Sequence, residues 1–320
     1  MRAWVLEDFG RLEVRCLEVP RGGGVLLRVA ACGVCGSDLS VYRGSPAMRA
    51  RWQPPLVLGH EVAGVVVEGS PDWLGRAVAV NPLVACGSCT HCRGGLENLC
   101  PERTNLGFHY PGGFAEEIRV PLRQLYPLPP GLPLWKGALA EPLAVALRAV
   151  ELAGPLLGRR ALVVGGGAIG SLVAWALGLG GARVWVSETN PLRQSWLAEQ
   201  GFALDSAEEG FELVFETVGS AASLELAVQK VAPGGRVVLV GLAETAPPLP
   251  LQRLVLQEIE LKGSYVFSHA DFLRAVALLP QLPEGLVQVR PFAEVQEVFA
   301  ALLQGRLGVP KVVLLHGGTV

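Results

Sequence analysis

The feature that most constrains this 320-residue chain is a strand, a glycine-rich turn and a helix that follow one another near its middle. The apolar run 161–164 leads into GGGAIG at 165–170, in which Gly165, Gly167 and Gly170 match G-x-G-x-x-G. Such a turn lets the backbone approach a pyrophosphate, and the N–H groups that open the helix favour an anion. Glycine-rich turns are common, so the motif is informative only in this context. It predicts a dinucleotide site.

Strand and helix patterns alternate around this turn. From Glu141 and Pro142 onward apolar residues recur with helical spacing, and strand patterns then follow at intervals. This alternation is typical of a doubly wound parallel sheet. We therefore predict an α/β chain with a Rossmann-type domain at 142–267. The expected strands cover 161–164, 182–187, 213–216, 236–241 and 260–266, and the expected helices cover 168–178, 192–200 and 221–231.

The first 141 residues have a different sequence pattern: short β-type runs are broken by glycine and proline, and no long helical pattern occurs. This predicts a mainly β or barrel-like domain at 1–141 with long functional loops. We expect the last segment, 268–320, to return to this domain. The expected strands of the first domain are 24–30, 62–67, 77–80 and 114–120. The last segment is expected to contain helices 270–279 and 293–303 and strand 311–315.

A carboxylate follows the second strand of the predicted α/β domain. Glu188 closes the run 182–187 and lies about 20 residues beyond Gly167. At this position a carboxylate accepts hydrogen bonds from an adenosine ribose and repels a 2′-phosphate, which favours NAD over NADP. A surface carboxylate at a strand end is the simpler alternative. Arg193 could stack on adenine, contact the extra phosphate of NADP, or be an ordinary solvated arginine.

Four cysteines lie close together in the first domain, with the spacing C-x2-C-x2-C-x7-C. Each C-x2-C step can aim two thiolates at one point, and four thiolates complete a tetrahedral zinc shell. A closed shell leaves no position for substrate, so we expect a structural zinc that holds a long loop. An iron–sulfur cluster is a weaker alternative, and His91 is expected to be a bystander. The predicted ligands are Cys86, Cys89, Cys92 and Cys100.

A second group of metal-binding residue types is spread along the first domain. Cys35 lies in GVCGSD at 33–38, and His60 and Glu61 lie in GHE at 59–61. A thiolate, an imidazole and a carboxylate with one open position suit a catalytic zinc. By spacing alone this prediction is weak, since a His-Glu pair is commonplace. Cys32 and Cys35 also form C-x-x-C, but no thioredoxin-like context supports a redox pair, so we expect Cys32 in the core.

Composition and charge exclude several function classes. The formal net charge is −2 and no run of lysine and arginine occurs, so no nucleic-acid partner is indicated. Seven cysteines are an odd number, and without a secretory signal clustered cysteines are more often metal ligands. Acids at Glu7 and Asp8 stand where a signal peptide needs apolar residues, which predicts a cytoplasmic protein. The uncharged stretch between Arg160 and Arg183 could nominally span a bilayer, but its glycines favour a buried strand, turn and helix, and we predict no membrane association.

Five motifs, taken in their order along the chain, resemble those of the zinc-dependent alcohol dehydrogenases of the medium-chain dehydrogenase/reductase family. They are GVCGSD at 33–38, GHE at 59–61, the four cysteines, EPL at 141–143 and GGGAIG at 165–170. Their joint order covers nearly the whole chain and is far more specific than any single motif. EPL, the CGSD stretch and GGFAE at 112–116 are most similar to the polyol (sorbitol-type) and threonine dehydrogenase branches.

The resemblance implies a GroES-like catalytic domain beside a Rossmann domain, with the active site in the cleft between them. It implies a catalytic zinc on Cys35, His60 and Glu61. Glu141 would be an alternative or water-mediated ligand. The family contacts its cofactor at the positions of Ala168, Ile169, Glu188, Arg193, Val240, Gly241, Leu242, Ser264 and Tyr265.

The expected activity is oxidation of a secondary or polyhydric alcohol to the carbonyl compound, with hydride transfer to NAD. The hydroxyl proton would leave through Ser37. Family members often carry histidine where this chain has Ser40, so the proton path ends at water or at another base. A zinc-free reductase of the same superfamily is the nearest rival, and a non-catalytic NAD(H)-binding protein is the second.

Oligomeric state and substrate are the remaining expectations. Family members are usually dimers or tetramers, which implies a homo-oligomer. Four residues could line the substrate pocket or belong to ordinary core and loops: Val41, Tyr42, Phe108 and Tyr265.

Overall fold

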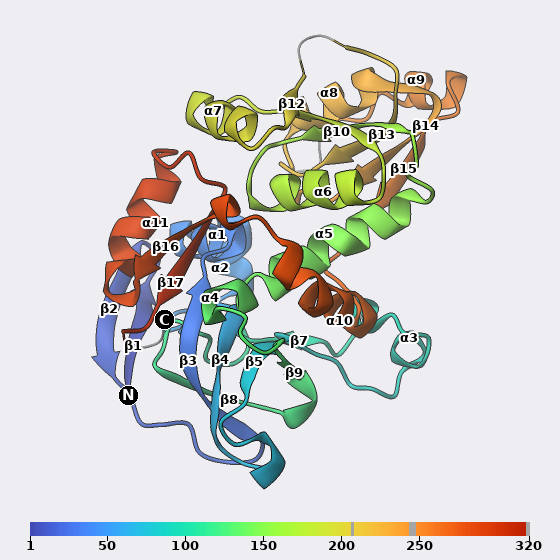
Figure 1. Ribbon diagram of the computed structural model, residues 1–320. Helices are drawn as coiled ribbons and strands as arrows, with labels where there is room; N and C mark the ends of the chain where they lie inside the picture. Colours follow the sequence, from blue (N-terminus) through green and yellow to red (C-terminus); the bar gives the residue numbers. More distant parts are fainter. Residues whose placement is uncertain (206–207, 243–247, 318–320) are drawn as a thin grey trace. The chain divides into compact units, whose positions relative to one another are not determined.

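A computed structural model of the chain describes residues 1–205, 208–242 and 248–317 (Figure 1). The chain divides into two compact units. Unit 1 comprises Met1–Glu141, Ser268–Gln304 and the end of the chain from Lys311, and unit 2 comprises Pro142–Phe267 and Gly305–Pro310. The sequence assigns 268–320 as a whole to the first domain, whereas Gly305–Pro310 groups with unit 2.

Unit 1 is mainly β, as the sequence predicts. Its seven-stranded sheet runs in the order β16 (Val287–Pro291), β17 (Lys311–Leu315), β3 (Val25–Gly33), β4 (Glu61–Glu68), β5 (Ala77–Val80) and β9 (Leu125–Pro127), with β8 (Glu117–Val120) paired to β3. Two smaller sheets join β1 (Arg2–Asp8) to β2 (Arg11–Cys16) and β6 (Leu83–Val84) to β7 (Thr104–Asn105). Nearly all of β3 and most of β4 are buried, so these two strands run through the core.

Short helices connect these strands. In unit 1 they are α1 (Gly36–Arg43), α2 (Pro46–Arg51), α3 (Thr90–Arg93), α4 (Leu134–Gly137), α10 (His269–Leu278) and α11 (Val295–Leu303). The sequence predicts no long helix before Glu141, and α1 and α2 are only eight and six residues long. Helices this short make too few turns to establish a helical period of apolar residues. The apolar pattern therefore does not predict α1, although this helix carries part of the candidate site.

Unit 2 contains a parallel six-stranded sheet in the order β12 (Ala203–Leu204), β11 (Arg183–Ser187), β10 (Arg160–Val164), β13 (Phe211–Glu216), β14 (Val231–Leu239) and β15 (Glu260–Gly263). Its helices are α5 (Ala140–Ala153), which starts just before the unit boundary, α6 (Ala168–Leu179), α7 (Pro191–Glu199), α8 (Ala221–Lys230) and α9 (Leu251–Leu256). Figure 1 shows α6 and α8 on opposite faces of the sheet. The predicted doubly wound architecture is confirmed.

Several strand ends in unit 2 differ from the expectation. β15 ends at Gly263 rather than at Val266, and Val266 itself, with a φ of 43°, lies outside the extended conformation. β14 begins at Val231, earlier than expected, and its pairing with β13 contains an irregularity near Phe211. Such ends depend on local backbone geometry, which apolar patterns do not encode.

The uncharged stretch that follows Arg160 forms β10, the glycine-rich turn and α6 within unit 2. Across the described residues, the structure contains no helix with both the length and the apolarity that crossing a membrane would require.

Candidate metal centre and cofactor site

The pairing of two antiparallel strands brings Cys35 and His60 together. β3 ends at Gly33 and β4 begins at Glu61, and these two residues are partners in the sheet register. Cys35 therefore follows β3 at the end where His60 precedes β4. In the described part of the chain, the Sγ atom of Cys35, a ring nitrogen of His60 and a carboxylate oxygen of Glu61 lie within 4.8 Å of one another. The strands gather donors that are far apart in sequence.

The chemistry of these three donors fits a zinc ion. His60 and Glu61 are buried and Cys35 is half-buried. Oε2 of Glu61 is buried without a hydrogen-bond partner, and such an oxygen costs free energy unless it meets a donor or a cation. Sulfur, nitrogen and oxygen from three residues, with a fourth position open, form the donor set of a catalytic zinc site.

Asp38 orients the ring of His60. It lies in the first turn of α1, is fully buried, and accepts hydrogen bonds from the backbone nitrogens of Cys35 (2.9 Å) and Gly59 (3.2 Å). Its Oδ1 is 3.4 Å from Nδ1 of His60, which leaves Nε2 available to a metal. Burial lowers the pKa of His60, but Asp38 outweighs burial and raises this pKa well above its ordinary value. The sequence gives no signal for this role, since it depends on where α1 places the carboxylate.

The two serines of α1 have different surroundings. Oγ of Ser37 lies 3.4 Å from Nε2 of His60, beside the metal donors. Oγ of Ser40 donates to the carbonyl oxygen of Gly36 at 3.1 Å, within its own helix. Ser37 thus lies where a proton path from the donor group would begin, whereas the Ser40 hydroxyl is held by the helix backbone.

A buried lysine from the far end of the chain also reaches this site. Lys311 opens β17 and is 4% exposed. Its Nζ donates to the carbonyl oxygen of Val34 at 2.9 Å and forms an ion pair with Oε1 of Glu61. Burial disfavours its charge, but Glu61 and Cys35 outweigh burial and raise the pKa of Lys311. The sequence gives no signal for Lys311, because it stands 250 positions from Glu61 and belongs to no motif.

Glu141 lies outside the close group of donors. It is buried in the first turn of α5, and burial raises the pKa of its carboxyl to about 7, with His60 partly offsetting this effect. Among the described residues, its carboxylate is not within the 4.8 Å that joins the other three donors. The geometry therefore favours Glu61 over Glu141 as the partner of Cys35 and His60.

One aromatic side chain adjoins His60, and a second packs on the first. The ring centroid of Phe108 is 5.2 Å from that of His60, and Trp52, which was not expected here, stacks on Phe108 at 5.1 Å. Of the other candidate pocket residues, Val41 is buried core and the Tyr42 hydroxyl donates to a backbone carbonyl. Phe108 and Trp52 thus form an apolar surface next to the donor group.

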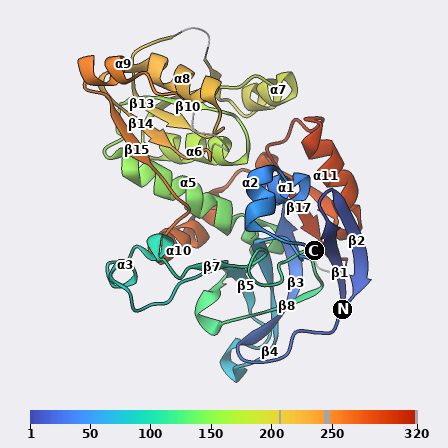
Figure 2. The ribbon, with the colours of Figure 1, turned by 180° about the vertical axis from the view of Figure 1, so that it is seen from behind.

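The four clustered cysteines lie in the loop between β6 and β7, which extends away from the sheet of unit 1 in both views (Figures 1 and 2). Their sulfur atoms lie within 4.8 Å of one another, and those of Cys86 and Cys92 are 3.9 Å apart. Four thiolates about 2.3 Å from a tetrahedral zinc are about 3.8 Å apart. Backbone N–H groups of Ser88 and Cys89 donate to Cys86 and lower its pKa to about 6. This geometry suits a closed metal site.

The glycine-rich turn has the features that a pyrophosphate site needs. Gly165 has a φ of 100°, which favours glycine. A Cβ on Gly170 would overlap the carbonyl oxygen of Gly165, so α6 packs closely on the strand. A Cβ on Gly167 would meet no atom of the described residues within 4 Å, so the backbone there is open to a ligand. Ala168 and Ile169, in the first turn of α6, are partly exposed beside it.

Glu188 is connected to this turn. It accepts hydrogen bonds from the backbone nitrogens of Gly166 (3.0 Å) and Asn190 (2.8 Å) and forms an ion pair with Arg193 at 2.9 Å. Burial raises the pKa of Glu188, but the bond from Asn190 and the charge of Arg193 outweigh burial and lower it. A carboxylate and a guanidinium therefore stand together beside the glycine-rich turn.

The other predicted cofactor positions follow the carboxyl ends of β14 and β15. The backbone nitrogens of Val240 and Gly241 donate to the carbonyl oxygen of Glu216, the last residue of β13, and that of Ser264 donates to Leu239. In open parallel sheets, ligands bind outside the carboxyl ends of the strands, which is also where the turn after β10 lies. The residues at these ends are Val240, Gly241, Leu242, Ser264 and Tyr265.

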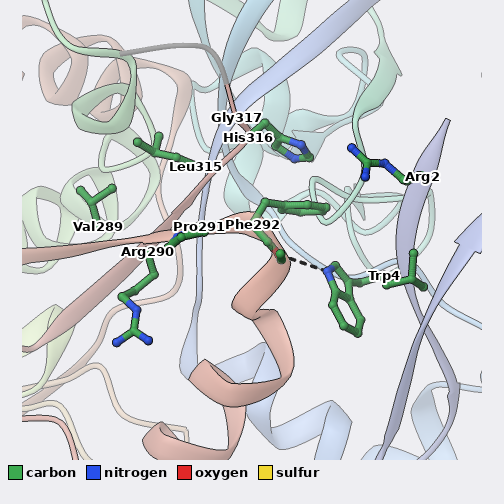
Figure 3. A pocket seen from close by; sticks show the side chains of 11 residues that line it. Arg2, Trp4, Val289, Arg290, Pro291, Phe292, Leu315, His316 and Gly317 are labelled. Atoms are coloured by element: carbon green, nitrogen blue, oxygen red, sulfur yellow. Dashed lines mark hydrogen bonds between the residues drawn. The ribbon is translucent and has the colours of Figure 1, made fainter.

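A separate pocket of about 670 Å³ lies within unit 1 (Figure 3). Its walls include Trp4, Phe292 and His316, and Nε1 of Trp4 donates to the carbonyl oxygen of Phe292 at 3.1 Å. The rings of Phe292 and His316 stack 3.6 Å apart, and burial lowers the pKa of His316 to about 4. None of the candidate metal or cofactor residues lines this pocket.

Comparison with known proteins gives matches to both units. An alcohol dehydrogenase GroES-like domain matches residues 21–130, and a zinc-binding dehydrogenase domain matches residues 168–281. The 2-dehydro-3-deoxy-L-galactonate 5-dehydrogenase of Pseudoalteromonas atlantica is 35% identical over 303 residues, which cover 88% of each chain. The L-idonate 5-dehydrogenase (NAD(P)(+)) of Escherichia coli is 32% identical over 307 residues, covering 87% of this chain and 86% of the relative.

A solved structure is similar over nearly the whole chain. The 2R,3R-butanediol dehydrogenase of Bacillus subtilis has a TM-score of 0.87 and 28% sequence identity, with 98% of this chain and 99% of that chain covered. These likenesses confirm the predicted fold, the reaction class, and the use of zinc and a nicotinamide cofactor. The chain therefore belongs to the zinc-dependent alcohol dehydrogenases of the medium-chain dehydrogenase/reductase family.

Proposed function

We propose that this chain oxidises a polyhydric or secondary alcohol, such as a sugar alcohol or a sugar acid, with NAD as hydride acceptor and with a catalytic zinc on Cys35, His60 and Glu61. One observation carries the proposal: three donors of different chemistry meet at the adjoining ends of β3 and β4, within 4.8 Å. The four clustered cysteines hold a second, structural zinc. Two relatives are named for oxidations of sugar acids.

In this site the zinc supplies Lewis acidity, which makes a hydroxyl group acidic near neutral pH, and the nicotinamide supplies the hydride acceptor. The protein residues position the metal donors and relay the proton of the substrate. Asp38 keeps Nε2 of His60 turned toward the donor group, through the contact at Nδ1. Ser37 accepts the proton of the substrate hydroxyl at Oγ while its own hydroxyl proton leaves to water. Phe108 shields one side of the donor group from water, since its ring lies against that of His60.

The substrate class is tested with a panel of polyols, sugar acids, L-threonine and simple secondary alcohols, each with NAD and NADP. We expect kcat/KM for a polyol or sugar acid to exceed that for a simple secondary alcohol by tenfold or more. The absence of turnover with every substrate and both cofactors would support a non-catalytic NAD(H)-binding protein. Reduction of enones or quinones by zinc-free protein would instead support the rival reductase.

Cofactor choice gives a second test, at Glu188. We expect Glu188→Ala to raise the ratio of kcat/KM with NADP to that with NAD by tenfold or more. A hydrogen bond from a ribose hydroxyl to a carboxylate contributes about 1.5–3 kcal/mol, or roughly 10- to 150-fold. Removing the carboxylate also releases Arg193 from its ion pair to meet a 2′-phosphate. Adding Arg193→Ala should cancel the gain with NADP, and an unchanged ratio in the single variant would refute the assignment of Glu188.

We also propose that the enzyme is a cytoplasmic homo-oligomer, a dimer or tetramer. On α9, Leu251, Val255 and Leu256 are 64%, 75% and 74% exposed. Within the described residues β15 pairs only with β14, so it is an open edge of the sheet. A second chain commonly covers such apolar patches and strand edges. Light scattering after size-exclusion chromatography tests this proposal, and a monomer at micromolar concentration would contradict it.

A further inference from the structure

We infer that Lys311 is a positioning residue for the metal centre: together with the missing side chain of Gly33, it fixes Glu61 so that one carboxylate oxygen is left for the metal. The inference rests on the proposed metal assignment and does not depend on the substrate. It adds two residues to the site, neither of which is a metal donor.

Three neighbouring strands place these residues side by side. In the sheet, β3 lies between β17 and β4, and Gly33 of β3 is the register partner of Val313 on one side and of Glu61 on the other. Lys311, two residues before Val313, therefore stands near the same end of the sheet as Cys35. A lysine and a glutamate from the two outer strands can meet only across the central strand.

The absence of a side chain on Gly33 leaves space for the carboxylate of Glu61. A Cβ built on Gly33 would overlap Oε2 of Glu61 and would lie 3.1 Å from its Cβ and Cδ atoms. The carboxylate of Glu61 therefore lies directly over the backbone of β3. The φ of Gly33 is not positive, so the backbone itself permits other residues. The requirement for glycine at this position comes from the carboxylate alone.

Lys311 then distinguishes the two oxygens of that carboxylate. Its ammonium group is bound to Oε1, while the buried Oε2 has no hydrogen-bond partner. The same ammonium group donates to the carbonyl oxygen of Val34, the residue before Cys35. One lysine is therefore bonded to both of the segments that supply the three metal donors.

Stability alone does not explain a buried ion pair here. Replacing such a pair by apolar residues of similar size is often neutral or stabilising, because the desolvation of two charges offsets their attraction. An ion pair that orients a metal ligand contributes to function instead, since mutation of a ligand's outer-shell partner commonly lowers metal affinity or activity by 10- to 100-fold. Cys35, Glu61 and a divalent ion are together neutral, and the charge of Lys311 makes the centre more electrophilic.

The test measures zinc release to a chromophoric chelator, 4-(2-pyridylazo)resorcinol, from the holoenzyme without alcohol or cofactor. The catalytic zinc is the kinetic phase that is missing in Cys35→Ala. We expect Lys311→Met to release this zinc at least tenfold faster than the unmodified protein. Gly33→Ala should accelerate the same phase although it changes no charge, because the added methyl group displaces the Glu61 carboxylate.

Two matched controls separate positioning from general destabilisation. Lys136→Met removes another buried lysine of unit 1, whose Nζ donates to the carbonyl oxygen of Leu282 at 3.2 Å. Gly36→Ala adds a methyl group next to Cys35 where no described atom lies within 4 Å. Both variants should release the catalytic zinc within about twofold of the unmodified rate, since neither touches Glu61.

Unchanged zinc release from folded Lys311→Met or from folded Gly33→Ala would overturn the inference, as would equal acceleration in the two controls. If Lys311→Met does not fold, Lys311→Arg takes its place, because arginine retains the charge but not the position of the donor. A zinc release rate equal to that of the unmodified protein would then overturn the inference. If Cys35→Ala still holds two zinc ions, the proposed metal assignment itself has failed. A failed substrate screen leaves this measurement unaffected.

Discussion

Cys35→Ala should leave the protein folded, with one zinc ion per chain instead of two and with kcat/KM for alcohol oxidation reduced about a thousandfold or more. The thiolate is one of three donors that meet within 4.8 Å, and two remaining donors hold zinc poorly. Loss of a Lewis acid removes several kcal/mol of transition-state stabilisation, and each 1.4 kcal/mol is a factor of ten. NADH binding, followed by fluorescence, should change less than threefold, because the cofactor residues belong to unit 2.

The matched control is Cys32→Ala. Cys32 is a fully buried thiol three residues before Cys35, and it is not part of the donor group. This variant should retain two zinc ions and most of its activity, although the small cavity lowers stability. Two zinc ions and normal turnover in Cys35→Ala, or loss of the catalytic zinc in Cys32→Ala, would refute the assignment.

The first effect of Cys89→Ser should be a loss of thermal stability. We expect it to lose the structural zinc and to lower the free energy of unfolding by about 4 kcal/mol or more, because losing a structural metal is among the few single changes with effects this large. For a domain of 150–250 residues this corresponds to a fall in Tm of roughly 8–16 °C. Zinc analysis with thermal unfolding followed by circular dichroism measures both effects.

His91→Ala is the control for this prediction. His91 lies inside the cysteine cluster in sequence, but its side chain is exposed and is not one of the grouped donors. It should retain two zinc ions and a nearly unchanged Tm. An unchanged Tm in Cys89→Ser would show that the cysteine loop is stable without metal, and a zinc loss in His91→Ala would make His91 a ligand.

Much of unit 2 could be predicted because its signals are local. The run before Gly165 is apolar over consecutive residues, as a strand buried on both faces must be, and β10 is buried from Ala161 to Val164. Gly165, Gly167 and Gly170 each meet a different steric demand of the turn. Such demands act within a few residues of the chain, so the sequence displays them directly.

The metal centre could be predicted only in part. The sequence and its motif order identified the donor types, but the distance between Cys35 and His60 depends on the register of β3 with β4. Asp38 and Lys311 were missed for the same reason. Their roles arise from a short helix without apolar periodicity and from a strand that follows Glu61 by 250 positions. Aspartate and lysine are usually surface residues, so neither residue type indicates a buried functional side chain from the sequence alone.

We propose that a zinc ion lies between Cys35, His60 and Glu61. Anomalous diffraction from crystals of the purified protein, measured on both sides of the zinc absorption edge, tests it directly. We expect two peaks per chain, one among the four cysteine sulfurs and one about 2.3 Å from Sγ of Cys35 and about 2.0–2.1 Å from Nε2 of His60. A single peak at the cysteine cluster, with none beside Cys35, would contradict it.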